Sequence, residues 1–541
     1  MRLSALAAGA VGMLIPAFGC ATLPRAVPSV EQDAMVVRGV VFHDRDGDGR
    51  RDPGEPGLGG VCVSNGRAVA VTDRHGYYEL PVEDEMVVFV IKPTNWRPPI
   101  DRLNLPRFYY VHRPKGSPEL EYPGLAPTGP LPASVDFALY PQPEPHRFSV
   151  ILLADTQPRD LQEVNYVARD VVSELVDIDA ALVFLLGDLV FDDLALHEPL
   201  NQVMAQIGRP VYNVLGNHDM NYDAADDRYA AESFSATYGP PYYALNYGPV
   251  HFVVLDDVVW EGGGAEHSGN YHAGLGQRQL EFLRNDLRQV PADRLVVLLM
   301  HIPIMQIAER AELYALLAER PHVVSFSGHE HVHRQWYLGA ADGWPAPWPH
   351  HHTTIVAACG SWWSGAPDEL GIPHTTQRDG TPNGWCLVDF DGNDYQVSFR
   401  AARRPATYQM NIYVPDELGI AEIGQTEVLV NVFAGSERSA VYLRVDAGEW
   451  VELQRVERVD PQYQVLYDAY QADPPPAGRK LSRPAVSAHV WSGVLPSGLH
   501  AGGHLLTVRS VDQWGRSTTA RRIIRVVGDR QAESVNQACG G

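Results

Sequence analysis

The sequence predicts an α/β domain in the middle of the chain with a β-sandwich on either side of it. Between residues 146 and 403, short and fully apolar runs alternate with helical patterns, which is typical of buried strands in a layered α/β unit. Residues 1–30 are set apart as a leader, and residues 31–141 and 404–530 carry short strand patterns separated by turns, which indicates small β-sandwiches. In addition, five apolar runs of the middle domain end in side chains that can bind metal ions.

The composition is that of a globular protein with several domains. Of the 541 residues, 45% are apolar and 20% are charged, which excludes a wholly disordered or low-complexity chain. At about 150 residues per domain, this length indicates three or four domains. The 43 basic and 66 acidic residues give a net charge of −23. An acidic surface of this kind disfavours binding to nucleic acid, but it is compatible with an enzyme that holds one phosphate through metal ions.

The N-terminal segment is expected to be a targeting leader. Arg2 is followed by an apolar run over residues 3–18, which is shorter than the about 20 residues of a bilayer span and is typical of a secretory signal. Residues 17–20 resemble a bacterial lipobox, which predicts a lipid anchor at Cys20; ordinary signal cleavage a few residues later is the alternative. We therefore expect an exported bacterial protein, periplasmic or an outer-membrane-anchored lipoprotein, whose only membrane contact is that anchor.

The remaining cysteines leave two possibilities open. Export permits disulfides, and Cys359 and Cys386 follow in neighbouring apolar segments. They either pair or remain two buried thiols. No stretch after the leader reaches 18 apolar residues, so no transmembrane helix is expected there.

The loop after the first strand pattern has the spacing of a calcium-binding loop. Strands are expected at residues 36–42 and, after a turn, within residues 72–80. Between them, the chain matches the template D-x-D-x-D-G-x5-E, which surrounds a hard Ca²⁺ ion with oxygens. These oxygens come from Asp44, Asp46, Asp48, Asp52 and Glu55. The stretch 39–80 resembles the calcium-binding β-sandwich repeats of bacterial surface proteins, so we expect a structural Ca²⁺ ion; a solvated acidic turn is the alternative.

In the middle domain, each strand pattern ends in polar residues. Strands are expected at residues 148–154, 180–186, 210–215, 295–300 and 323–326, and helices at 161–176 and 194–207. The strands are followed by Asp155 and Gln157, by Asp188, by the turn Gly216-Asn217-His218-Asp219, by His301, and by the turn Gly328-His329-Glu330-His331. Because ligands bind just past the carboxyl ends of such strands, we expect these side chains to form one site.

This set of side chains suits two transition-metal ions. Two such ions about 3.5–4 Å apart need one shared carboxylate and several further nitrogen or oxygen donors. Asp188 is the natural bridge because a carboxylate offers two oxygens, and Asn217 adds an oxygen without adding charge. Imidazole and carboxylate ligands together favour Mn, Fe or Zn over Ca or Mg.

Taken in this order, the five motifs resemble those of the calcineurin-like metallophosphoesterase family over about residues 148–400. The tract at residues 242–256 is also similar to that family, and the flanking β domains resemble those of its subgroup with additional N-terminal and C-terminal β domains. The resemblance implies a four-layer α/β sandwich and a metal-dependent phosphoric ester hydrolase.

The resemblance also implies a role for each site residue. Those expected to hold the first metal are Asp155, Gln157, Asp188 and His331, and those expected to hold the second are Asp188, Asn217, His301 and His329. A metal-bridging hydroxide would attack the phosphorus of a phosphate monoester or diester, His218 would protonate the leaving oxygen, and Asp219 would orient His218. The family usually has histidine at the position of Gln157. An amide is a weaker donor, so the first metal is expected to bind less tightly or to be a harder ion such as Mn or Fe.

The expected substrate is a small phosphate ester outside the cytoplasm, such as a lipid head group, a sugar phosphate or a nucleotide. The alternative function is a surface binding protein whose phosphoesterase-like domain is catalytically weak, and metal content distinguishes the two. The C-terminal region, with strand patterns such as 428–433 and 505–511, carries no expected chemistry.

Three smaller features accompany the main motifs. The run His350-His351-His352 is expected in an exposed polar loop; capping the site or binding an extra metal is the alternative. The side chains of Trp336, Trp362 and Trp363 either line a leaving-group pocket or serve packing. Asp192 and Asp193 either support the metal site or are simply solvated.

Overall fold

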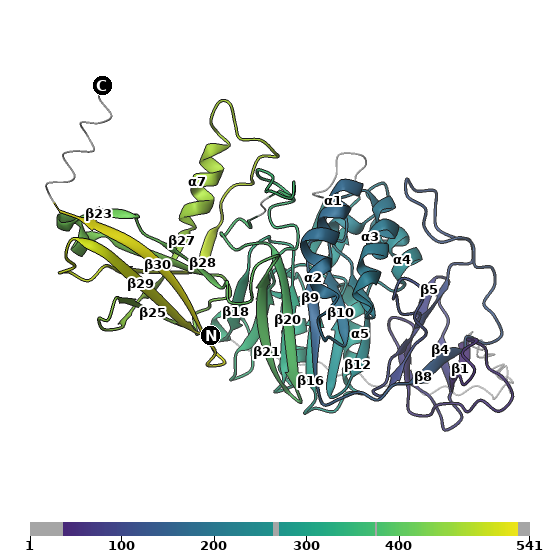
Figure 1. Ribbon diagram of the computed structural model, residues 1–541. Helices are drawn as coiled ribbons and strands as arrows, with labels where there is room; N and C mark the ends of the chain where they lie inside the picture. Colours follow the sequence, from purple (N-terminus) through teal and green to yellow (C-terminus); the bar gives the residue numbers. More distant parts are fainter. Residues whose placement is uncertain (1–35, 263–269, 374–375, 529–541) are drawn as a thin grey trace, which may run out of the picture. The chain divides into compact units, whose positions relative to one another are not determined.

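The computed structural model describes residues 36–262, 270–373 and 376–528 (Figure 1). The expected leader with Cys20 lies outside the described residues, as does Cys539. Within the described residues, no helix combines the length and the apolar character that crossing a membrane requires.

The N-terminal region forms two four-stranded sheets. In spatial order, one sheet contains β4 (Tyr77–Pro81), β1 (Val36–His43), β8 (Phe137–Pro141) and β6 (Trp96–Arg97). The other contains β3 (Val69–Val71), β2 (Cys62–Ser64), β5 (Met86–Ile91) and β7 (Tyr109–His112). In β4, Tyr78 and Leu80 are buried whereas their neighbours are exposed, as expected for a strand with one face on a core. The strand and turn expected within residues 72–80 are therefore present.

Two larger sheets lie face to face in the middle of the chain. The first contains β11 (Val211–Val214), β10 (Leu182–Leu186), β9 (Arg147–Leu153), β20 (Gly384–Asp391) and β21 (Asp394–Ala401). The second contains β12 (Tyr243–Tyr247), β13 (Val250–Val254), β16 (Leu295–Leu299), β17 (Val323–Ser327), β19 (His350–Thr354) and β18 (Arg334–Leu338). Strands β9, β10 and β11 are mutually parallel, and so are β13, β16, β17 and β19. A separate hairpin joins β14 (Val258–Trp260) and β15 (Tyr271–Ala273).

Helices cover the outer faces of these two sheets (Figure 1). The segments beside the first sheet are α1 (Leu161–Tyr166), the π-helical segment η1 (Val167–Val172), α2 (Ser173–Leu175), α3 (His197–Met204) and α4 (Glu232–Tyr238). The helices beside the second sheet are α5 (Gly276–Leu287) and α6 (Arg310–Leu317). The first helix begins at residue 161 because the Asp160 side chain accepts a hydrogen bond from the backbone N–H of Glu163.

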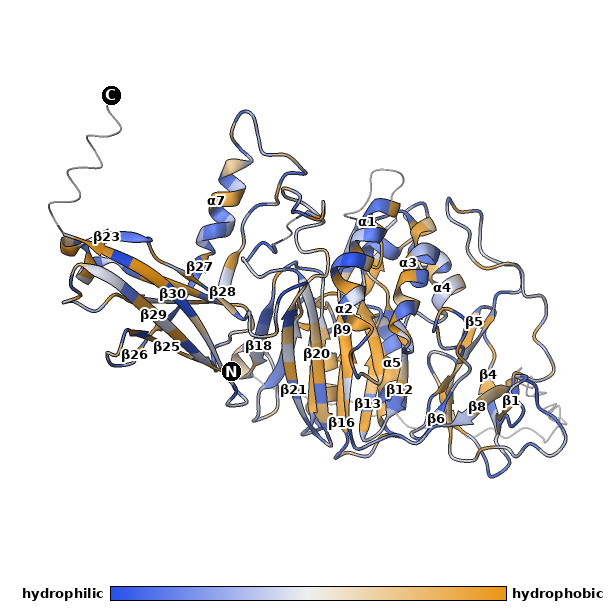
Figure 2. Ribbon diagram, in the orientation of Figure 1, coloured by the Kyte–Doolittle hydropathy of each residue, from blue (hydrophilic) through white to orange (hydrophobic). Residues whose placement is uncertain are grey.

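The side chains of β9 point alternately to its two faces, and this accounts for the layers of sheets and helices. Val150 and Leu152 belong to the core between the two sheets, whereas Ile151 and Leu153 pack against the helices. A strand that is buried on both faces reads as a continuous apolar run, which is the pattern seen in the sequence. The central sheets are accordingly the most continuously hydrophobic part of the ribbon in Figure 2. The four-layer α/β architecture follows from this arrangement.

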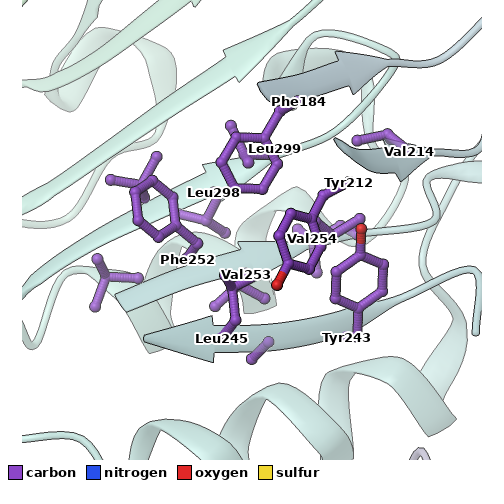
Figure 3. Close-up of a cluster of buried hydrophobic side chains, with 14 of the residues drawn as sticks. Phe184, Tyr212, Val214, Tyr243, Leu245, Phe252, Val253, Val254, Leu298 and Leu299 are labelled. Atoms are coloured by element: carbon purple, nitrogen blue, oxygen red, sulfur yellow. The ribbon is translucent and has the colours of Figure 1, made fainter. Parts of the chain in front are cut away.

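Aromatic and aliphatic side chains fill the space between the sheets (Figure 3). The ring centroids of Phe184 in β10 and Phe252 in β13 are 5.2 Å apart, which joins one sheet to the other. The hydroxyl of Tyr243 in β12 donates to the carbonyl of Asn213 in β11, 3.0 Å away. Burial of each aromatic ring contributes about 1.5–3 kcal/mol. This core fixes the two sheets relative to each other, and with them the strand ends that form the site.

The C-terminal region is also built from two sheets. One contains β22 (Met410–Tyr413), β24 (Glu427–Val432), β28 (Val486–Val494) and β27 (Gln454–Val459). The other contains β23 (Glu417–Gly419), β30 (Ser517–Val527), β29 (Gly502–Val511), β25 (Ala440–Val445) and β26 (Val451–Glu452). A short helix, α7 (Pro461–Ala469), begins at Asp460, whose side chain accepts from the backbone N–H of Tyr463.

Two expectations about buried polar residues are resolved here. The run His350 to His352 is not an exposed loop: it forms most of β19 and is buried inside the second sheet. The ring nitrogens of His350 and His352 each lie 2.7 Å from the hydroxyl of Ser325, which makes burial tolerable. Cys359 and Cys386 are both buried free thiols, so they do not pair.

Candidate metal centre

The expected metal ligands come together at one edge of the two central sheets. Strands β9, β10 and β11 deliver Asp155, Gln157, Asp188 and Asn217 from the first sheet, and β16 and β17 deliver His301, His329 and His331 from the second. The backbone N–H of His329 donates to both carboxylate oxygens of Asp155 at 3.1 Å, across the two sheets. The tightest group is Asp188, His301 and His329, whose ligand atoms lie within 4.8 Å of one another.

Left-handed backbone conformations turn most of these side chains into the site. The φ angles are +52° at Asp155, +37° at Gln157, +52° at Asp188, +74° at His329 and +51° at His331. Non-glycine residues rarely adopt such angles, and they cluster at functional sites where the surrounding structure enforces them. The conformation allows two residues spaced two apart, such as His329 and His331, to face the same site instead of opposite faces of a strand.

Glycines make room for the close approach of the ligands. A Cβ atom at Gly187 would lie 2.4 Å from Nδ1 of His301, and one at Gly328 would lie 2.6 Å from Oδ2 of Asp155. Both distances are shorter than any van der Waals contact. The glycines in the Gly-Asp and Gly-His-Glu-His motifs are therefore required by the packing of the site.

The surroundings of His301 fit a cation. Its Nδ1 lies 2.9 Å from the carbonyl oxygen of Leu186, which can only accept, so this nitrogen carries a proton. Burial alone would lower the pKa of His301, but Asp188 and Asp155 outweigh it and raise that pKa to about 10, so a metal ion that binds Nε2 displaces a proton from it. Nε2 lies 3.2 Å from Oδ1 of Asp188, 3.1 Å from Oδ1 of Asn217 and 3.2 Å from Nδ1 of His329. Lone pairs converging from four side chains are the donor set of a metal ion.

The second half of the site is built around Asp155 and His331. Nδ1 of His331 donates to the carbonyl of Gly360, which leaves Nε2 free, 3.6 Å from Oδ1 of Asp155. Gln157 places its Nε2 2.8 Å from Oδ2 of Asp188, and its Oε1 faces the thiol of Cys359 at 3.5 Å. Rotation about the terminal side-chain bond exchanges the two amide atoms and presents the oxygen to the site, with no other atom displaced.

Burial governs the protonation of these groups. Burial raises the pKa of Asp155 to about 7, although His301 opposes the shift. It would also raise the pKa of Asp188, but His301 and His218 outweigh it and hold that pKa well below its ordinary range. Burial lowers the pKa of His329 to about 3, assisted by His301, and that of His331 to about 3. Both imidazoles are thus neutral at pH 7, the form that binds a metal.

His218 lies beside the metal ligands without being one of the converging donors. Its Nδ1 is 2.5 Å from Oδ1 of Asp192, and its Nε2 is 4.0 Å from Oδ2 of Asp188. Its ring stacks on that of Phe191 with centroids 4.7 Å apart. Burial alone would lower the pKa of His218, but Asp188 and Asp192 outweigh it, so the pKa lies above its ordinary value. The arrangement can therefore hold a proton at Nε2.

The structure does not place the Asp219 carboxylate against the ring of His218, which it was expected to orient. The Asp219 carboxylate is fully buried and accepts hydrogen bonds from the backbone N–H groups of Leu189, Val190 and Gly216. It therefore ties the loop after β10 to the turn after β11. The carboxylate that bonds to the His218 ring is that of Asp192, for which the sequence left a supporting role and solvation open.

Several residues of the site have no motif in the sequence. The Tyr222 hydroxyl donates to Asp192 at 2.9 Å. The Asp257 carboxylate accepts from the backbone N–H groups of His301 at 3.1 Å and Ile302 at 2.8 Å, which fixes the start of that loop. The only signal for Asp257 was its place directly after the tract at residues 242–256. Trp362 stacks on the ring of His331 with centroids 3.9 Å apart, so it lines the site, whereas Trp363 is buried.

The N-terminal loop brings together part of the expected calcium ligands. Asp44, Asp46 and Asp48 offer oxygens within 4.8 Å of one another, whereas Asp52 and Glu55 are not in that group. Asp44 is buried and accepts from the backbone N–H groups of residues 47 and 49 and from the Tyr140 hydroxyl. Glu55 is buried too and accepts from the N–H groups of residues 45 and 52.

Comparison with known families agrees with this geometry. The profile described as calcineurin-like phosphoesterase matches residues 148–333. The profiles for the N terminal and the C terminal of calcineurin-like phosphoesterase match residues 45–122 and 352–517. Together the three matches cover most of the chain, in the order of the three regions of the fold.

Two further comparisons add little. A search of curated proteins gave no match. Among solved structures, the chain is similar to a purple acid phosphatase from yellow lupin (Lupinus luteus) seeds, with 13% identity over 59% of this chain and 70% of that chain. The TM-score is 0.34. A similarity at this level supports no conclusion about substrate or metal.

Proposed function

The chain belongs to the calcineurin-like phosphoesterase family and is a metal-dependent phosphoric ester hydrolase; we propose that it acts through a two-metal site with His218 as the general acid. The observation that carries the proposal is the convergence of Asp188, Asn217 and His329 on Nε2 of His301. A single proton cannot satisfy these donors at once, whereas a cation can.

The proposal assigns the donors to two ions. The first is held by Asp155, Gln157, Asp188 and His331, and the second by Asp188, Asn217, His301 and His329. Bound there, two metal ions would lower the pKa of water and neutralise the phosphoryl oxygens. The mixed imidazole and carboxylate donors favour Mn, Fe or Zn. Gln157 is a neutral donor, which supports Mn or Fe at the first position.

His218 is assigned the proton transfer to the leaving oxygen. Its Nδ1 is engaged by Asp192, and the Tyr222 hydroxyl donates to the same oxygen of Asp192. The stack on Phe191 fixes the plane of the ring. These contacts support a ring held in one orientation, with Nε2 left to donate. A positioned acid of this kind contributes about 10²–10⁴-fold to the rate.

The substrate is proposed to be a small phosphate monoester or diester. Lipid head groups, sugar phosphates and nucleotides all carry the required group, and nucleic acid is disfavoured by the net charge of −23. We place the reaction outside the cytoplasm, because the first residues have the pattern of an export signal with an anchor at Cys20.

A structural Ca²⁺ ion in the N-terminal loop completes the proposal. Support comes from the cluster of Asp44, Asp46 and Asp48, with Asp44 held in place by Tyr140. On binding Ca²⁺, the Glu55 carboxylate would turn to the ion from the backbone N–H groups of residues 45 and 52, which it now accepts from.

One experiment tests the proposed function. Metal content is measured by elemental analysis, and rates are measured on a panel of phosphate monoesters and diesters with Mn²⁺ and with chelator. Two ions per chain at the site, with activity lost in chelator and restored by Mn²⁺, are expected. A chain with no bound transition metal and no hydrolysis of any ester would instead favour the surface binding protein.

A further inference from the structure

A cavity opens beside the metal centre. It has a volume of about 350 Å³ and shares two residues with the site already described: the expected ligand His329 and Trp362, which stacks on His331. Its far side is formed by residues 485–488 at the start of β28, which belong to the C-terminal region. A substrate whose scissile phosphate sits at the metals would therefore extend toward this cavity.

The cavity contains a cation with no carboxylate partner. Arg378 lines it, and the ion pairs among the described residues do not include this guanidinium, whose Nε donates only to the carbonyl of Arg483 at 3.1 Å. The second arginine of the lining, Arg334, differs: it stacks on Trp336 at 3.7 Å and lies 3.6 Å from the Glu457 carboxylate. An unpaired guanidinium facing a cavity is suited to bidentate binding of a phosphate or carboxylate.

The carboxylates of the lining are already engaged. Glu330 accepts from the amide of Gln306 at 2.7 Å. Asp379 accepts from the backbone N–H groups of His333 and Thr381 and from the ring of His489. Neither of these two carboxylates neutralises Arg378 through an ion pair.

One histidine of the lining has an unpartnered ring nitrogen. His333 lines the same cavity, is 1% exposed, and its Nδ1 has no hydrogen-bond partner among the described residues. A buried polar atom of this kind costs free energy unless something binds it. This nitrogen is itself shielded from the cavity, so Arg378 is the group of the wall that is open to a ligand.

The C-terminal region holds this wall in place. The backbone N–H of Ala485 donates to the carbonyl of Arg378 at 2.9 Å, and His489 bonds to the carboxylate of Asp379 at 3.0 Å. Asn431 in β24 donates to the carbonyl of Asp379. The backbone N–H of Arg378 donates to the carbonyl of His331, 3.4 Å away. The cationic wall is therefore tied both to a metal ligand and to the C-terminal sheets.

We propose that this cavity binds a second anionic group of the substrate through Arg378, so that the preferred substrates are phosphate esters whose leaving group itself carries a phosphate or carboxylate. The inference rests on the proposed function, because it places the scissile ester at the metal centre. It also gives the C-terminal region a direct part in substrate selection.

The test compares three aryl esters that differ only in the second group: phenyl phosphate, 3-carboxyphenyl phosphate and 1,3-phenylene bisphosphate. The variants are Arg378→Gln, Arg378→Lys and, as a matched control, Arg288→Gln, whose exposed side chain donates a hydrogen bond to Asn285. For Arg378→Gln we expect kcat/KM to fall about 10- to 100-fold on the two esters that carry a second anionic group and less than about threefold on phenyl phosphate. The lysine variant should recover part of the loss, and the control should match the wild type.

A binding measurement separates this inference from the proposed function. Titration calorimetry compares phenylphosphonate with 1,3-phenylenediphosphonate, which are not hydrolysed. The diphosphonate is expected to bind the wild type more tightly, and Arg378→Gln is expected to remove that advantage. If the wild type hydrolyses no ester, the proposed function fails, and the calorimetry still decides the cavity. Equal losses on all three esters, or an unchanged diphosphonate advantage in Arg378→Gln, would overturn the inference.

Discussion

The Nδ1 atom of His218 lies 2.5 Å from Oδ1 of Asp192, and the Tyr222 hydroxyl reaches the same oxygen at 2.9 Å. A carboxylate on one ring nitrogen fixes the tautomer and the orientation of the ring, so that the other nitrogen carries a proton toward the substrate. Asp192 is thus a positioning residue.

Replacing Asp192 with asparagine is expected to lower kcat on alkyl phosphates by about 10- to 100-fold. This is part of the rate enhancement of about 10²–10⁴-fold that a positioned general acid supplies. The metal content should not change, because Asp192 is not among the converging donors. The control is Asp193→Asn, which keeps the side-chain oxygen that caps the next helical turn. Equal rates for the two variants would remove the positioning role.

The variant His218→Ala should retain its metals and lose activity selectively. On substrates with poor leaving groups we expect a fall of about 10²–10⁴-fold, because the leaving oxygen needs a proton. On nitrophenyl phosphate the loss should be much smaller, since nitrophenolate leaves unprotonated. Steady-state rates on both classes, with metal analysis of the same preparation, check this. Equal losses on both would leave His218 with a binding role only.

Asp188→Asn should abolish both metal binding and activity. The carboxylate lies 3.2 Å from Nε2 of His301 and is the expected bridge between two ions. We expect a fall in rate of at least about 10³-fold, more than the loss of a single hydrogen-bond donor typically costs, together with loss of most bound metal. The exposed carboxylate of Asp179 provides the control variant Asp179→Asn. A fully active Asp188→Asn protein would contradict the two-metal site.

Asp219→Ala is expected to act on stability. The substitution leaves the buried N–H groups of Leu189, Val190 and Gly216 without an acceptor. At about 1–3 kcal/mol for each unsatisfied group, the free energy of unfolding should fall by about 3 kcal/mol or more. Denaturant unfolding of the metal-free protein measures this, and Asp219→Asn, which keeps one acceptor, should lose less. Unchanged stability with a selective loss on poor leaving groups would return the orienting role to Asp219.

Calcium is expected to stabilise the chain without affecting catalysis. Millimolar Ca²⁺ should raise the melting temperature of the calcium-stripped protein by a few degrees through mass action. The double variant Asp46→Asn and Asp48→Asn should lose this shift, while Asp44 is left to hold the loop through Tyr140. Phosphoesterase rates at saturating Mn²⁺ should not follow Ca²⁺. An identical shift in the double variant would place the stabilising ion elsewhere.

Local sequence patterns predicted the strands and helices whose formation depends mainly on residues close together in the sequence. The strands and helices of the first central sheet, from β9 to β11, lie close to the expected ranges. Their signal was strong because a strand buried on both faces must be apolar throughout. The polar residues at the strand ends were equally visible, because they interrupt those runs at fixed places.

Buried polar residues were the weak point of sequence reasoning. His350 to His352 suggested an exposed loop, since three imidazoles in a row are polar. In the fold they pair with Ser325 and with the Tyr395 hydroxyl, and they form a strand. Hydrogen-bond partners on other strands cannot be read from the local pattern. Hydropathy alone therefore predicted solvent exposure for three histidines that are buried.

The sequence by itself determined that the chain places metal-binding residues after buried parallel strands, because side chains at strand ends share one edge of a sheet whatever the details of packing. Only the tertiary structure decided which carboxylate serves His218. Asp192 and Asp219 both lie near it in the chain, but the direction of each side chain depends on loops that other elements hold. The same holds for Arg378, whose surroundings come from segments about a hundred residues apart in sequence. Long-range contacts of this kind exist only once the two central sheets and the C-terminal sheets have packed together.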